Sequence, residues 1–156
     1  MGKRIKLPLS VEEKSKLRLA GVKLAELHTL EAPHLAKILD SSLDSAQKLI
    51  GLAEFQRVPS IGFELADKLV NHLKIYSLHE ISDKDGAQLF DQLEQEMGIW
   101  TDSCVEDQLR CVIHFANNPT STEQWFYFTE ERKAYRNSFG YPKERPKTPW
   151  YEIKGE

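Results

Sequence analysis

The sequence predicts an all-α fold, a compact bundle of about six helices followed by a C-terminal arm. Apolar residues recur at helical intervals throughout residues 10–118, and no alternating strand pattern interrupts them. At 156 residues with 40% hydrophobic content, the chain is long enough to bury one core. We therefore expect a helical domain over residues 10–118 and an arm over residues 119–156 that packs on it.

Capping residues and helix breakers place the first elements. Ser10 and Glu13 form a capping-box pattern, so a helix begins near residue 11, and Gly21 is its expected break. Pro33 suits the first turn of a second helix, and apolar residues between 43 and 53 mark a third.

The later helices follow from the same signals. Apolar periodicity predicts one helix over about 63–73 and another over about 89–97. Ser103 and Glu106 repeat the capping-box pattern and open a last helix, which Asn117-Asn118-Pro119 closes.

An internal echo predicts a tandem pair of helical hairpins. Ala46-Gln47-Lys48-Leu49 is similar to Ala66-Asp67-Lys68-Leu69, so residues 39–49 would form a degenerate hairpin before an intact one. Two further segments share their apolar residues, which are Val22, Leu24, Leu27 and Leu35 in one and Ile75, Leu78, Ile81 and Leu89 in the other.

The arm begins with consecutive aromatic residues, Trp125-Phe126-Tyr127-Phe128. Because such a run is too apolar to leave in water, we expect it to dock on the helical body. A short helix from Glu130 and an extended, Pro-rich stretch should follow.

Charge is distributed unevenly although the net charge is only −3. Residues 1–23 carry seven basic and two acidic residues, residues 77–110 carry two basic and nine acidic ones, and residues 132–150 carry six basic and one acidic. Two interpretations stay open for the basic ends: ordinary solvated surfaces, or a footprint for a polyanion.

The segment around Pro59 has the parts of a phosphate-gripping hairpin. Pro59 shapes a turn, Gly62 tolerates positive φ and leaves no Cβ in front of a ligand, and Ala66 allows close helix approach. Free amides at the start of the next helix form an anion site that holds phosphates and reads no bases. The alternative is a plain connection whose Pro and Gly serve only its geometry.

This segment resembles the helix-hairpin-helix DNA-binding motif, whose pattern runs apolar, Pro, Gly, apolar, Gly, then three residues and Ala. The matching residues are Val58, Pro59, Ile61, Gly62 and Ala66, and Ser60 stands at the first glycine.

Over residues 55–117 the chain resembles the bacterial pathogenicity-locus family, also described as mitomycin-resistance-like helix-hairpin-helix proteins. The second block that carries this resemblance runs from Gly98 to Arg110, with Ser103 in place of an expected Pro. The resemblance implies sequence-independent DNA binding, in DNA repair or damage resistance.

We expect the DNA contacts at the hairpin, in the residues Arg57, Val58, Pro59, Ser60, Ile61, Gly62, Phe63, Leu65 and Lys68. The resemblance also implies a monovalent cation at the carbonyls of Gln56, Val58 and Ile61. No other cofactor is expected.

The two cysteines are expected to be reduced and structural. Cys104 and Cys111 lie seven residues apart in a predicted helix, about 10 Å between Cα atoms, which is too far for a disulfide. A metal shared by Cys111 and His114, or a nucleophilic Cys104, is the less favoured alternative.

Catalysis has little support elsewhere in the sequence. The carboxylates Asp83, Asp85, Asp102 and Asp107 match no two-metal spacing, and neither a phosphate-binding loop nor a nucleophile elbow is present. We therefore expect a binding protein and not an enzyme.

The sequence leaves two alternative functions open and predicts a location. The chief rival is a protein-interaction module that uses the acidic middle and the aromatic arm, and the weaker one is a cysteine-dependent enzyme. The sequence has no apolar run of spanning length and no secretory pattern at its start, so we expect a cytoplasmic protein that does not contact membranes.

Overall fold

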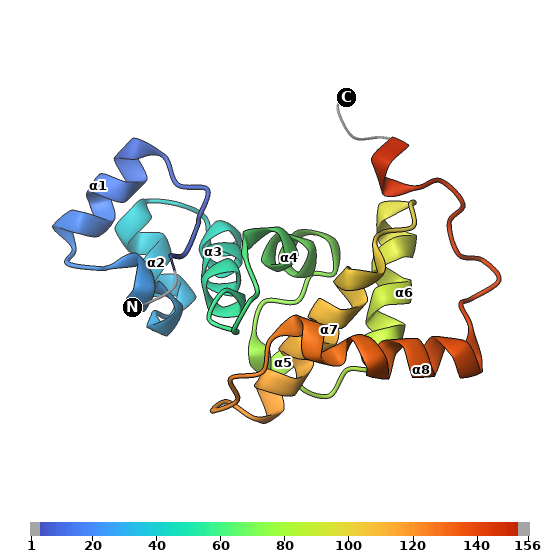
Figure 1. Cartoon of the computed structure of the whole chain (residues 1–156). Helices are drawn as coiled ribbons and strands as arrows, with labels where there is room; N and C mark the ends of the chain where they lie inside the picture. The colour runs from blue at the N-terminus through green and yellow to red at the C-terminus, as the bar shows by residue number, and fades with distance from the viewer. Residues whose placement is uncertain (1–3, 153–156) are drawn as a thin grey trace. The chain divides into compact units, whose positions relative to one another are not determined.

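A computed structural model describes residues 4–152. Their structure is helical and confirms the predicted all-α class (Figure 1). Within these residues the only extended pairing is an isolated bridge between Trp100 and Pro149. No helix in the described range combines the length and the apolar character needed to cross a membrane. Lys3 of the basic start and residues 153–156 of the expected arm lie outside the described residues.

The chain divides into two compact units, and the first comprises residues up to Arg57 together with Gly62–Ser77. Its helices are α1 (Val11–Leu19), α2 (Ala32–Leu39), α3 (Leu43–Phe55) and α4 (Phe63–Asp67), with a 3-10 helix η1 (Leu24–Thr29) and a π-helical turn η2 (Lys68–His72).

The first unit confirms the predicted start of α1 and shortens the helix. Ser10 and Glu13 form the complete capping box, with both reciprocal hydrogen bonds present. The helix ends at Leu19, because Gly21 adopts a φ of +74°. The next apolar residues therefore lie in η1. The buried core of this unit comprises Leu17, Leu27, Leu35, Leu39, Ala46, Leu49 and Ala53.

The second unit comprises Val58–Ile61 and the residues from Leu78 onward. Its helices are α5 (Leu78–Ile81), α6 (Gly86–Met97), α7 (Ser103–Asn117) and α8 (Thr129–Phe139), with 3-10 helices η3 (Trp125–Phe128) and η4 (Trp150–Glu152). The expected boundary at residue 118 does not coincide with this division, since α8 and the segment after it belong to the same unit as α6 and α7.

The capping box expected at Ser103 and Glu106 is wrong. The N-cap of α7 is Asp102, whose carboxylate accepts a hydrogen bond from the Cys104 amide at 2.9 Å. Glu106 is fully buried and pairs with arginines instead. The sequence spacing is the same for a glutamate that turns back to the cap and for one that faces the interior, so only packing distinguishes them.

The two similar segments, residues 22–35 and 75–89, share a local order of elements. In the first unit a short helix, η1, precedes α2, and in the second unit a short helix, α5, precedes α6. The echoing residues Leu27 and Leu35 are buried in one unit, as are Ile81 and Leu89 in the other. In each copy these two shared apolar positions are thus part of a buried core.

Candidate functional site

The predicted hairpin turn is a hydrogen-bonded turn from Val58 to Ile61. The Ile61 amide donates to the Val58 carbonyl at 3.1 Å, and Ser60 has a φ of +66°. Proline at the second position and positive φ at the third are typical of a type II turn, which favours glycine at the third position. Ser60 therefore has a backbone conformation that favours glycine.

The Ser60 side chain forms hydrogen bonds that glycine could not. Its hydroxyl accepts from the Trp125 amide at 2.9 Å and donates to the Pro59 carbonyl. The Cys111 thiol lies 3.9 Å from the same carbonyl and 3.5 Å from that of Glu123. The turn is thereby tied to the start of η3 and to α7. Nothing in the sequence near Ser60 indicates a partner 65 residues away.

At the start of α4, the expectation for Gly62 is wrong in one respect. Gly62 is the N-cap and has an extended backbone, with a φ of −106°, so positive φ is not the reason for glycine here. It is exposed, and a Cβ added to it would meet nothing within 4 Å. Glu64 is exposed in the first turn of the same helix.

The other predicted contact residues divide into anchors and exposed groups. The side chains of Val58, Ile61 and Leu65 are buried, whereas Arg57 is exposed. The remaining ones, Pro59, Phe63 and Lys68, are half-buried. At the three buried positions only the backbone can reach a ligand, whereas Arg57, Pro59, Phe63 and Lys68 also offer side chains.

Gln56, predicted only for its carbonyl, has a structural side chain. Its Oε1 accepts from the Lys6 amide at 2.9 Å, and its Nε2 donates to the carbonyls of Lys6 at 2.7 Å and Leu52 at 3.1 Å. The amide thus fastens the segment before α1 to α3. The three carbonyls expected to hold a monovalent cation are divided between the two units, and that cation stays a prediction.

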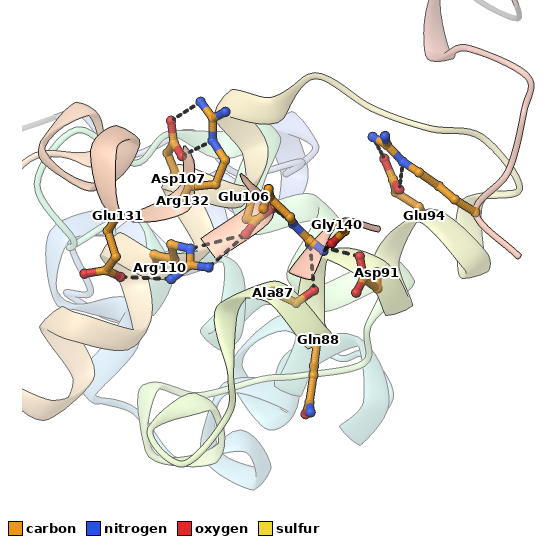
Figure 2. A network of polar contacts seen from close by, with 12 residues as sticks. Ala87, Gln88, Asp91, Glu94, Glu106, Asp107, Arg110, Glu131, Arg132 and Gly140 are labelled. Atoms are coloured by element: carbon orange, nitrogen blue, oxygen red, sulfur yellow. Dashed lines mark hydrogen bonds and ion pairs between the residues drawn. The ribbon is translucent and has the colours of Figure 1, made fainter. Parts of the chain in front are cut away.

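The second unit contains a network of buried ion pairs that sequence reasoning missed (Figure 2). Glu94, Glu106 and Asp107 are each no more than 1% exposed. Each carboxylate pairs with at least one arginine at 3.0 Å or less, in the pairs Glu94–Arg145, Glu106–Arg110, Glu106–Arg136 and Asp107–Arg132. Burial of a charge is tolerated only with such partners.

Arg136 has the most partners in this network. Its guanidinium donates to Glu106, to Asp91 and to the carbonyls of Ala87 and Gly140, and it lies 4.2 Å from the centroid of the Tyr141 ring. Burial acts to lower the pKa of Arg136, but the hydrogen bonds to the carboxylates outweigh it and raise the pKa. Burial raises the pKa of Asp91 despite the arginine beside it.

The network changes the interpretation of the charge pattern. All three arginines of the basic tail, Arg132, Arg136 and Arg145, pair with carboxylates of the acidic segment within one unit. Neither open interpretation describes them, because their guanidinium groups already bond carboxylates of the same unit. A hydrogen bond to Asp107 raises the pKa of Arg132, and one to Glu94 raises the pKa of Arg145.

Neither cysteine forms a disulfide; Cys111 is buried and Cys104 is half-buried. His114 lies 3.1 Å from the carboxylate of Glu123 through its Nε2. Within residues 4–152, no three histidine, cysteine, aspartate or glutamate side chains gather as metal ligands would.

The aromatic run packs only in part as expected. Phe128 is buried and packs against His114 in a tilted arrangement, with 5.4 Å between ring centroids. Trp125 is half-buried, while Phe126 is 49% and Tyr127 61% exposed. A 3-10 turn directs successive side chains around its axis, so adjacent aromatics cannot all face the core.

Comparison with known proteins gives one match. No curated protein and no solved structure matches the chain. Residues 48–134 match the family model Cdd1, described as pathogenicity locus. The match spans more than half of the chain, from within α3 to within α8, and includes both blocks that carried the sequence resemblance. The chain therefore belongs to the pathogenicity-locus family.

Proposed function

We propose that this protein binds DNA without regard to base sequence, through the backbone of the segment from Val58 to Leu65. The observation that carries the proposal is the conformation of Ser60, whose φ of +66° places a non-glycine residue where the helix-hairpin-helix pattern requires a glycine-type turn. Maintaining this conformation in serine costs about 1 kcal/mol. Such backbone strain is typical of functional sites, and it is consistent with a turn whose shape serves binding.

Two further observations support this function. The side chains of Val58, Ile61 and Leu65 are buried, so at these positions only the backbone is left for phosphate recognition. Gly62 is open on its Cβ side although its own φ does not need glycine. The absence of a side chain there allows a phosphate to approach the backbone.

Charge attraction should contribute little to the affinity of the proposed complex. Arg57 and Lys68 are the cations that flank the segment, and the tail arginines are already paired with carboxylates. Affinity should therefore fall with salt along a shallow slope that reports only a few phosphates. A role in DNA repair and a binding rather than catalytic activity are part of the same proposal.

A DNA titration tests it. Labelled duplex, single-stranded and branched DNA are titrated with protein at two salt concentrations, using the natural chain and Gly62→Val. The valine should lower affinity roughly tenfold, the effect of losing one charged hydrogen-bond contact, without affecting folding. Ala25→Val, at an exposed position of η1, is the matched control. Undetectable binding to every DNA form at low salt by folded protein would refute the proposal.

The exposed side chains of Phe126 and Tyr127 favour a second candidate, a protein-interaction module. The rings stack edge to face with 5.0 Å between centroids and form an apolar patch on η3. The acidic part of that alternative loses support, because the most buried carboxylates are paired within the unit.

A further inference from the structure

We infer that Glu94 and the α6–α7 loop form a recognition site for an extended, arginine-bearing peptide, and that residues 141–150 of the same chain are its resident ligand. We call these residues the strap. They follow Gly140, whose φ of +68° separates them from α8. The inference is independent of DNA binding.

Glu94 forms a pocket for the Arg145 side chain of the strap. Glu94 is 1% exposed and accepts two hydrogen bonds from Arg145, at 2.7 Å to Nε and 2.9 Å to Nη2. The Thr101 amide also donates to Glu94 at 2.8 Å and so orients the carboxylate from the loop side. Bidentate pairing with a fixed carboxylate distinguishes arginine from lysine.

Aromatic rings complete that pocket. The Arg145 guanidinium lies 5.8 Å from the Trp100 ring centroid and 5.9 Å from that of Phe90, while the strap's own Tyr141 contacts it at 3.9 Å. Planar guanidinium groups favour such faces. Two of the three rings belong to the receptor side, so they remain when the strap leaves.

The strap also pairs with the α6–α7 loop through main-chain hydrogen bonds. The Trp100 amide donates to the Thr148 carbonyl at 2.9 Å, and the Trp150 amide donates to the Trp100 carbonyl at 2.9 Å. Gln95 on α6 adds a hydrogen bond to the Glu144 carbonyl at 2.8 Å. Adding an extended segment through main-chain hydrogen bonds is a general mode of peptide recognition.

The strap lies on the surface of the unit and not in its core. Every residue from 141 to 150 is half-buried or exposed. The receptor residues fall inside the region matched by the family, whereas the strap lies beyond it.

The test measures binding of the strap sequence in trans to the full chain. A labelled peptide of residues 141–152 is titrated into the natural protein, into Arg145→Ala, and into Arg145→Ala combined with Glu94→Gln. The natural chain should bind weakly, because its own strap competes at an effective concentration in the millimolar range. Arg145→Ala should bind roughly tenfold more tightly or better, and the double variant should lose that gain. A peptide with lysine at position 145 is the specificity control and should bind more weakly.

Folded Arg145→Ala protein that binds the peptide no better than the natural chain would overturn the inference. Should the variant fail to fold, hydrogen exchange in the natural chain decides. The Trp100, Thr101 and Trp150 amides should exchange through a local opening, faster than α7 core amides such as Leu109. Exchange of all of them at the rate of global unfolding would show that the strap is a fixed part of the core and refute the inference.

Discussion

The buried carboxylate of Glu106 accepts a hydrogen bond from Nε of Arg136 at 2.9 Å and so ties α7 to α8. Both side chains are shielded from water, the glutamate at 0% and the arginine at 7% exposure. Removing one partner of such a pair leaves a buried charge without its compensation, which is far more damaging than losing a surface ion pair. Stability measurements can therefore distinguish this network from ordinary surface charges.

Arg136→Ala should lower the free energy of unfolding by about 3 kcal/mol, near the lower end for a broken buried pair, because Arg110 still bonds Glu106 at 3.0 Å. Denaturant unfolding measures the change. Lys133→Ala on the same helix removes an exposed pair with Glu130 and should change stability by less than about 0.5 kcal/mol. Equal effects of the two substitutions would contradict the assignment of a buried network.

Ser60→Gly and Ser60→Ala should differ in stability. Glycine removes the hydrogen bond to Trp125 but relieves the left-handed backbone, and these effects, each about 1 kcal/mol, nearly cancel. Alanine loses the hydrogen bond and keeps the strain, so it should lower the free energy of unfolding by about 1–2 kcal/mol. Thermal or denaturant unfolding measures both. An alanine variant as stable as the glycine variant would show that backbone strain at Ser60 is negligible.

Phe128 and Tyr127 are adjacent residues with opposite environments, which makes them a matched pair. Phe128→Ala should lower stability by about 3 kcal/mol, since the ring is 8% exposed. Tyr127→Ala should change it by less than about 1 kcal/mol, because that ring is 61% exposed. Urea unfolding of both variants measures this difference. A larger loss of stability in Tyr127→Ala than in Phe128→Ala would contradict the burial of Phe128 and the exposure of Tyr127 in η3.

His28 gives the protein a pH-dependent stability term. Burial lowers its pKa below 6.5, with Arg57 contributing, and its buried Nδ1 has no hydrogen-bond partner among the described residues. The folded state therefore favours the neutral ring. This stability is complete above pH 6.5, where the unfolded ring is also neutral, and is lost as the pH falls through the lower pKa of the folded state.

His28→Gln should accordingly reduce the loss of stability between about pH 8 and about pH 5.5. Urea unfolding at the two pH values provides the comparison. His34→Gln, at an exposed histidine of α2, is the control and should leave the pH dependence of the natural protein in place. Identical pH dependence in the natural chain and in His28→Gln would refute this role of His28.

The sequence by itself determined the helical class and several helix ends. The capping box at Ser10, the proline at the start of α2 and the stop of α7 at Asn117 are local signals, because the hydrogen bonds they describe join residues within a few positions. The hairpin was predictable as a turn for the same reason, since Pro59 restricts the backbone beside it.

Tertiary structure alone decided the roles of Ser60, Glu106 and Arg136. Ser60 bonds a residue 65 positions away, and Arg136 bonds a glutamate 30 positions away. Such contacts depend on how helices pack, and no periodicity encodes them. The same applies to Gly62, whose extended backbone follows from its place as the N-cap of α4 and not from its residue type. Charge counts along the chain could not show that three arginines of the basic tail pair with carboxylates of the acidic segment inside one unit, because pairing depends on distance in space.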